Sequence, residues 1–160
     1  MMIKKIISGA QTGADRAALD FAINNDIPHG GWVPMGRIAE DGIIPAKYPV
    51  QELARTGYKV RTKQNVVDSD GTVIIYFGTR SGGTEQTLLF CIREKKPYVL
   101  IDGEEFKIES AVKKIKGFVD HNSISVLNAA GPRASKEPRA YGYTKEVLLR
   151  FLKDYAEKCE

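Results

Sequence analysis

The stretch TVIIYFGTRSGGTEQTLLFCIREKKPYVLI, residues 72–101, decides the fold class. Thr72–Phe77 is an apolar, β-branched run with turn residues on both sides, which is typical of a strand buried on both faces of a parallel sheet. Glu85–Lys95 follows with apolar residues at helical spacing, and Pro97–Ile101 returns to a strand pattern. A strand, a loop, a helix and a strand in this order indicate a parallel α/β unit.

The same alternation extends along the rest of the chain. Further strands are predicted at 3–8, Ile27–Val33, Tyr58–Arg61 and Ser123–Leu127, and further helices at Ala14–Asn24, Val50–Ala54, Asn65–Asp68, Glu109–Phe118 and Thr144–Lys158. The segment between Pro34 and Tyr58 is otherwise expected to be loop. We therefore predict one α/β domain, residues 1–160, with a doubly wound, mainly parallel sheet and helices on both faces.

Composition fits an ordinary globular protein. The chain has 160 residues, of which 42% are hydrophobic and 28% charged, and both values are near the averages for such proteins. No apolar run reaches the roughly 18 residues that a membrane span needs. We expect a cytoplasmic protein without a membrane partner.

Metal-ligating residue types are few and scattered. Cys91 lies in an apolar segment, Cys159 is next to the C-terminus, and neither His29 nor His121 has a cysteine nearby. This pattern predicts neither a disulfide framework nor a metal site built from His and Cys.

The formal net charge of +4 raises the question of nucleic acid. Solvated helix faces such as Lys113–Lys116 can account for much of this excess. Nucleic acid is therefore not the expected partner, although a nucleic-acid-binding module stays open as an alternative.

Two loops share an unusual composition. Ser8–Asp15 follows the first strand and Thr79–Thr87 follows the central one, and both combine glycine with hydroxyl residues and open a helix. Right-handed crossovers place both loops at one edge of the sheet, and we expect the two strands to be neighbours there. Glycine allows close backbone approach, and a helix N-terminus favours a phosphate or similar anion.

A purely structural interpretation of these loops is also available. Thr12 and Thr84 would cap helices, Asp15 and Glu85 would complement helix dipoles, and the glycines would only make turns. Two such loops at one edge favour ligand binding over this interpretation.

The usual nucleotide motifs do not fit. The chain has no G-x-x-x-x-G-K-[ST], and its first loop has G-x-x-x-G in place of G-x-G-x-x-G. Arg37 follows the second predicted strand, where a dinucleotide fold would place an acidic residue for the ribose. ATP hydrolysis and NAD binding are therefore not expected.

Other charged and polar residues fall in segments expected at the same edge. The basic ones are Arg37, Lys47, Arg80, Arg133, Lys136 and Arg139. Glu40 and Asp41 could ligate a cation or bind a heterocycle, or form a solvated charge run. Asn128–Arg133 is predicted as a polar loop after the last strand. A ring of arginines would attract a small anion.

Five ordered motifs resemble one known family over nearly the full chain. They are ISGAQTGADRAALDFAI, HGGWVPMGRIAEDG, IPAKYP, NVVDSDGTVIIYFGTRSGGTEQT and VLNAAGPRASK. This set resembles the molybdenum carrier family, in a Rossmann-like superfamily that also contains Smf-type DNA-processing proteins and lysine-decarboxylase-like phosphoribohydrolases.

The resemblance implies that the molybdenum cofactor, or a related phosphorylated pterin or nucleotide, is held across the two loops. The residues it assigns to this site are Gly9, Gln11, Thr12, Gly13, Asp15, Ser81, Gly82, Gly83, Thr84 and Thr87. Arg37, Arg80, Asn128 and Arg133, from the loops expected at the same edge, complete the predicted site. Backbone amides would receive the phosphate and arginines would neutralise it. The resemblance also implies homo-oligomers paired through helix faces and a molybdoenzyme as the recipient of the cofactor.

One departure from the hydrolase branch bears on catalysis. Those enzymes carry P-G-G-x-G-T-x-x-E, and alignment on Gly83-Thr84 places the glutamate position at Thr87. A threonine lacks the carboxylate pKa that the role requires, and Glu85 is about 200° away around a helix. We therefore expect a binding protein. A nucleotide or nucleotide-sugar hydrolase that uses Asp15, Glu85 or the Glu40–Asp41 pair remains the alternative.

Overall fold

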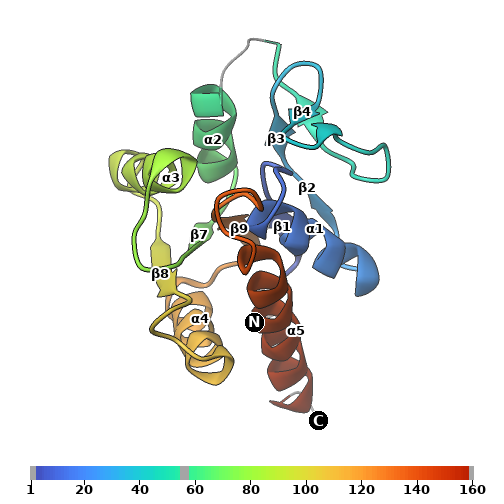
Figure 1. Cartoon of the computed structure of the whole chain (residues 1–160). Coiled ribbons are helices and arrows are strands. Elements are labelled where there is room, and N and C mark those ends of the chain that lie inside the picture. Colours follow the sequence, from blue (N-terminus) through green and yellow to red (C-terminus); the bar gives the residue numbers. More distant parts are fainter. Residues whose placement is uncertain (1–2, 55–57, 159–160) are drawn as a thin grey trace.

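The structure, a computed structural model, describes residues 3–54 and 58–158. A five-stranded parallel sheet with the order β2-β1-β9-β7-β8 lies at its centre (Figure 1). Its strands are β1 Lys5–Ile7, β2 His29–Gly30, β7 Gly71–Tyr76, β8 Tyr98–Asp102 and β9 Val126–Ala130. The helices are α1 Ala14–Asn24, α2 Tyr58–Val67, α3 Gly82–Arg93, α4 Ile108–Asn122 and α5 Ala140–Lys158. The prediction of a Rossmann-like, doubly wound α/β fold is confirmed.

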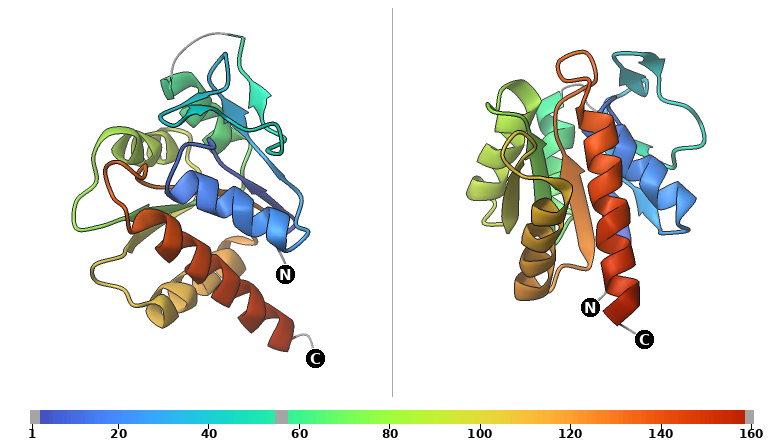
Figure 2. Two further views of the ribbon diagram at one scale, coloured as in Figure 1. Left: turned by 45° about the vertical axis from the view of Figure 1, so that its right-hand side comes forward. Right: turned by 60° about the horizontal axis from the view of Figure 1, so that its bottom comes forward.

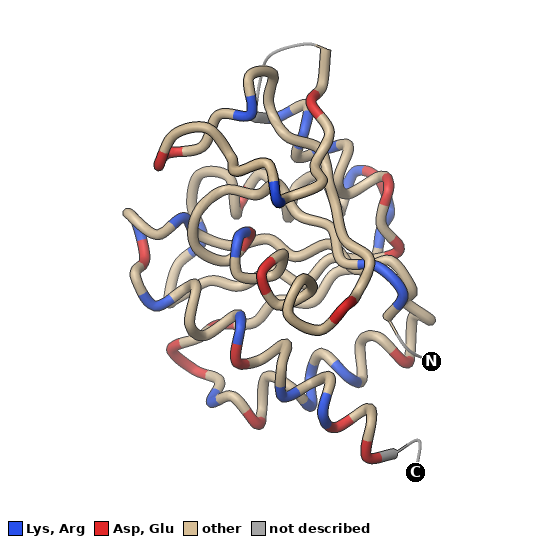
Figure 3. Tube along the Cα trace, turned by 90° about the vertical axis from the view of Figure 1, so that its right-hand side faces the viewer, with Lys and Arg blue, Asp and Glu red and all other residues tan. Residues whose placement is uncertain are grey.

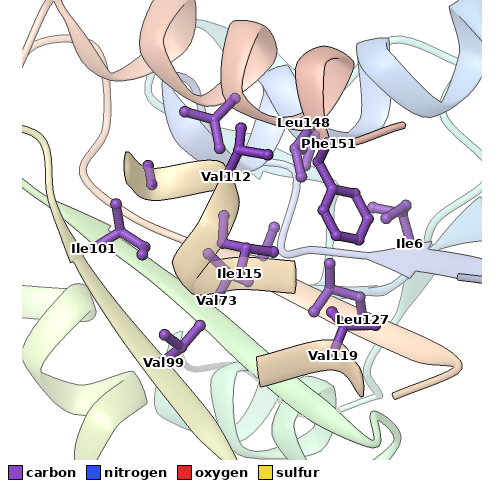
Figure 4. Packing of buried hydrophobic residues seen from close by; sticks show 14 of the residues in the cluster. Ile6, Val73, Val99, Ile101, Val112, Ile115, Val119, Leu127, Leu148 and Phe151 are labelled. Atoms are coloured by element: carbon purple, nitrogen blue, oxygen red, sulfur yellow. The ribbon is translucent and has the colours of Figure 1, made fainter. Parts of the chain in front are cut away.

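Both faces of the sheet are covered by helices (Figure 2). Successive side chains of a strand point to opposite faces, and Val73 and Ile75 of β7 pack with α1, α4 and α5 whereas Ile74 packs with α2 and α3. Figure 4 shows the first of these layers, where Leu127 of β9 meets the helix α4 and the Phe151 ring of α5. The apolar run of β7 is therefore buried on both sides, as its sequence predicts.

Two crossovers leave the middle of the sheet in opposite directions. The β1-α1-β2 unit runs toward one edge and the β7-α3-β8 unit toward the other. Because both crossovers are right-handed, α1 and α3 lie on opposite faces. The loop after β1 and the loop after β7 therefore flank the point where the winding reverses.

The prediction that β1 and β7 are neighbours is wrong, because β9 lies between them. Helix α4 brings the chain back across β7, and β9 enters the gap with Leu127 and Ala129 buried. The residue that follows β9 must be small, since a Cβ on Gly131 would lie 2.6 Å from the Cβ of Ala14.

The strand predicted at Ile27–Val33 is divided in the structure. Gly31 has φ 140°, and a Cβ there would lie 1.9 Å from the carbonyl oxygen of Ser8. The chain bends at this glycine and continues as β3, Trp32–Val33, outside the central sheet. Backbone proximity to β1 is the physical reason for the break.

Two further predictions between 50 and 68 are wrong. The helix predicted at Val50–Ala54 is strand β6, Gln51–Glu52, which pairs in parallel with β3. The strand and helix predicted between Tyr58 and Asp68 are the single helix α2, which buries Asn65 and Val66. Tertiary packing overrides local propensity in both segments.

The last strand begins three residues later than predicted. Ser123 adopts the left-handed conformation with φ 51° at the C-terminus of α4, which ends that helix, and β9 starts at Val126.

The segment after Pro34, predicted as loop, contains a hairpin of β4, Ile38–Ala39, and β5, Gly42–Ile43. No helix of the described ranges is long and apolar enough to cross a membrane.

Candidate functional site

A cavity of about 490 Å³ opens where β1, β9 and β7 end. Its lining consists of Gly9, Gln11, Asp15, Arg61, Thr62, Asn65, Tyr76, Phe77, Thr79, Ser81, Gly82, Gly83, Thr84, Thr87, Asn128, Ala129, Ala130, Gly131, Pro132, Arg133, Lys136 and Glu137. The volume lies within the range of small-molecule sites, and the carboxyl edge of a doubly wound sheet is where such sites occur. This cavity is the candidate functional site.

The second glycine loop presents backbone donors to the cavity. Helix α3 begins at Gly82, and the N-cap residue Ser81 makes no side-chain capping hydrogen bond. The amides of Gly82, Gly83 and Thr84 donate to no acceptor in the described part of the chain, and the Glu85 amide lies 3.5 Å from the Ser81 carbonyl oxygen. These three N–H groups and the positive end of the helix dipole suit an anion.

The first glycine loop differs, because its amides at Ala10, Gln11, Thr12 and Ala14 already have partners. The Thr12 amide donates to Gln11 Oε1 at 3.0 Å, and the Ala14 amide donates to the Pro132 carbonyl at 3.2 Å. Thr12 and Gly13 lie outside the cavity lining. A Cβ on Gly13 would lie 2.3 Å from that same carbonyl oxygen. This part of the loop therefore holds the 132–135 segment, and only Gly9, Gln11 and Asp15 line the cavity.

Asp15 and Arg61 form an ion pair in the cavity wall. Arg61 Nη1 lies 3.5 Å from Asp15 Oδ2, and both side chains are almost fully buried. Gly9 leaves the space for this pair, because a Cβ there would overlap Arg61 Nη1. Burial raises the pKa of Asp15 to about 6, and the nearby charge of Arg61 limits the rise.

The raised pKa of Asp15 predicts a pH-dependent stability. The Asp15 carboxyl group holds its proton more tightly in the folded protein than in the unfolded chain. Protonation of Asp15 therefore stabilises the fold below about pH 4, and this stabilisation is lost as the pH rises through 6. The shift corresponds to about 3 kcal/mol. In urea unfolding at pH 4.5, 5.5 and 7, we expect Asp15→Asn to gain stability relative to the unmodified protein as the pH rises. A difference that stays constant with pH would show an ordinary pKa.

Asn128 lies in strand β9 and not in a loop, which corrects the prediction for this segment. It stands directly opposite Thr72 of β7, and its Nδ2 donates to Thr72 Oγ1 at 3.2 Å. The strand continues to Ala130 because Leu127 and Ala129 are buried in the core on the other face. Asn128 therefore lines the cavity from the sheet.

Two predicted arginines do not line the cavity. Arg37 donates to four backbone carbonyl groups of its own loop, those of Ile44, Pro45, Tyr48 and Val50. Arg80 pairs with Glu85 at 3.0 Å and lies over the ring of Tyr76. Arg37 is thus a loop-organising residue, since its guanidinium group donates four hydrogen bonds within the loop.

Glu40 and Asp41 are also engaged within the protein. Glu40 accepts hydrogen bonds from Thr12 Oγ1 and from the amide and hydroxyl of Ser135. The hydrogen bond from the Ser135 hydroxyl is the main cause that lowers the pKa of Glu40. Asp41 accepts two hydrogen bonds from Arg16 at 2.9 and 3.2 Å. The pair attaches the hairpin to α1 and to the 132–135 segment, and neither carboxylate lines the cavity.

The cations at the cavity differ in how strongly they are paired. Arg133 Nε lies 3.5 Å from Glu40 Oε2. Lys136 forms no ion pair within the described ranges, and its Nζ lies 3.1 Å from the place that a Cβ on Gly82 would occupy. Lys136 thus adds a positive charge at the N-terminus of α3. Lys47 and Arg139 lie outside the lining.

Thr87 and Glu85 face different environments. Thr87 is buried in the cavity wall, and its hydroxyl donates to the Gly83 carbonyl at 2.9 Å. Glu85 is outside the lining and pairs with Arg80. Of the four carboxylates named as catalytic candidates, Asp15 is the one in the cavity wall.

Sequence reasoning missed the contribution of α2. Arg61, Thr62 and Asn65 line the cavity from this helix. The spacing i, i+1 and i+4 places them on one helical face, which was obscured by the predicted strand at Tyr58–Arg61. A helical pattern over the whole segment would have revealed the shared face.

A parallel sheet wound in two directions from a cavity at its carboxyl edge defines a Rossmann-like α/β protein. Residues 6–152 match the model of the circularly permutated YpsA SLOG family, and the chain belongs to this family. A circular permutation relocates the chain ends within a conserved packing. The central position of the last strand, β9, accords with such an arrangement.

A solved structure resembles this chain over nearly its whole length. The crystal structure of a "Putative molybdenum carrier protein" from Syntrophus aciditrophicus SB shares 51% sequence identity and superimposes with a TM-score of 0.92. The match covers 94% of this chain and 95% of the other. The family resemblance in the sequence is confirmed. The comparison with curated proteins found no match.

Proposed function

We propose that this protein binds a phosphorylated pterin, the molybdenum cofactor in particular, and carries it without making or breaking a bond. The ligand phosphate would lie at the N-terminus of α3 and its ring system in the cavity. The name of the similar Syntrophus protein supports the cofactor class. A molybdoenzyme would receive the cargo.

One observation carries this proposal. Three adjacent amides, those of Gly82, Gly83 and Thr84, donate to no acceptor in residues 3–54 and 58–158, and the ammonium group of Lys136 lies beside them. Four donors that converge at a positive helix end are suited to the oxygen atoms of a phosphate. The cavity beside them has room for a small heterocycle.

A thermal-shift screen tests the proposal. Molybdopterin at about 100 times its Kd should stabilise the fold by about 2.7 kcal/mol, or roughly 5–10 °C for a chain of this size. Mass spectrometry should recover the ligand unchanged after incubation. No stabilisation by molybdopterin at saturating concentrations would contradict a carrier role.

The alternative of a nucleotide hydrolase rests on Asp15. Its carboxyl group lies in the cavity wall, and burial raises its pKa to about 6, near the value that suits a general acid. Release of free base from AMP, abolished in Asp15→Asn, would favour this function over transport.

A nucleic-acid-binding module is the second alternative. Figure 3 shows basic and acidic positions interleaved along the chain trace. Salt-sensitive retardation of short single-stranded DNA would be needed to support this function.

A further inference from the structure

We propose that Asn128 recognises a hydrogen-bond donor on the ring of the ligand, so that the cavity selects heterocycles with an amino or N–H edge over rings that lack one. This inference rests on the proposed function and specifies the other end of the same ligand. Guanine and pterin rings both present such an edge.

Asn128 is a buried polar side chain with an unused acceptor. The residue is 3% exposed and lines the cavity. Its Nδ2 donates to Thr72 Oγ1, whereas its Oδ1 accepts no hydrogen bond from the described residues. This oxygen is open to the cavity, so it is available to a hydrogen-bond donor on a ligand.

The contact with Thr72 sets the orientation of the amide group. Asn128 Nδ2 donates to Thr72 Oγ1 at 3.2 Å. With its NH₂ group on Thr72, the amide leaves Oδ1 as the atom available to a ligand.

The position of Asn128 suits recognition of the ring. It projects from β9 in register with Thr72, on the face of the sheet that α2 and α3 cover. The proposed phosphate donors are at the start of α3, and Thr87, one turn later in the helix, also lines the cavity. A ligand anchored by its phosphate at Gly83 would extend its ring toward Asn128.

Binding measurements with matched probes test this inference. GMP presents donors on its base, purine riboside 5′-monophosphate has none on that edge, and ribose 5-phosphate lacks the base. By calorimetry we expect GMP to bind about tenfold or more tightly than purine riboside 5′-monophosphate, which is the effect of one hydrogen bond. Competition of GMP with molybdopterin would distinguish a purine-specific site from one shared with pterins.

The variant Asn128→Leu removes the acceptor at similar volume. It should bind the two nucleotides equally while its affinity for ribose 5-phosphate stays unchanged. If the unmodified protein binds the two nucleotides equally, the proposed ring recognition by Asn128 is wrong. Such a result would leave the proposed phosphate site at the N-terminus of α3 unaffected. If no probe, molybdopterin included, binds, both the inference and the proposed function fail. The comparison of the two nucleotides in the unmodified protein tests the inference even if Asn128→Leu does not fold.

Discussion

Gly83→Asp should reduce the affinity for phosphorylated ligands about a thousandfold. A Cβ at Gly83 meets no atom within 4 Å, so the new side chain has room, and its carboxylate would lie beside the three unpaired amides. Two like charges about 4 Å apart near a protein surface repel by about 4 kcal/mol, which corresponds to this loss. Titration calorimetry with molybdopterin measures it.

The fold should tolerate this change. An acidic residue in the first turn of a helix is favourable for the helix dipole, and Gly83 has no positive φ. Gly142→Asp is the matched control, because Gly142 is also in the first turn of a helix and a Cβ there also meets nothing within 4 Å. The control should bind like the unmodified protein. Equal affinity in Gly83→Asp and the control would show that the N-terminus of α3 does not bind the ligand.

Arg61→Met should lower the free energy of unfolding at pH 7 by about 3 kcal/mol. The substitution leaves the buried Asp15 carboxylate without the guanidinium group 3.5 Å away, and breaking a buried ion pair by removing one partner typically costs 3–5 kcal/mol. The loss should shrink near pH 5, because Asp15 then takes up a proton. Urea unfolding at both pH values measures this.

A double-mutant cycle separates the ion pair from packing. In an Asp15→Asn background, Arg61→Met should cost much less at pH 7, since no buried charge remains to be compensated. An equal cost in both backgrounds would mean that Arg61 contributes through its aliphatic packing and not through Asp15.

The sequence predicted local structure where the evidence is local. Helix α1 was predicted with its observed bounds because its apolar residues recur at helical spacing. The alternation of β7 side chains between two faces follows from strand geometry alone. By contrast, Tyr58–Arg61 was predicted as a strand, whereas the structure places it in helix α2.

The candidate site shows the same division. Gly82, Gly83 and Thr84 were identified from sequence because a glycine loop and the helix it opens are contiguous in the chain. Arg61 was missed, since its partner Asp15 is 46 positions away and the contact exists only when α2 lies over the first loop. Arg37 was assigned to the ligand, although four carbonyl groups of its own loop occupy it.

By itself the sequence determined the α/β class, the buried central strand and the two glycine loops at one edge, because spacing and turn chemistry act between near neighbours. Only the tertiary structure decided that β9 lies between β1 and β7 and that α2 closes the cavity. Strand order depends on how whole helices pack over a sheet, as where Gly131 lets α1 approach. Contacts between residues more than a hundred positions apart leave no periodic pattern in the chain.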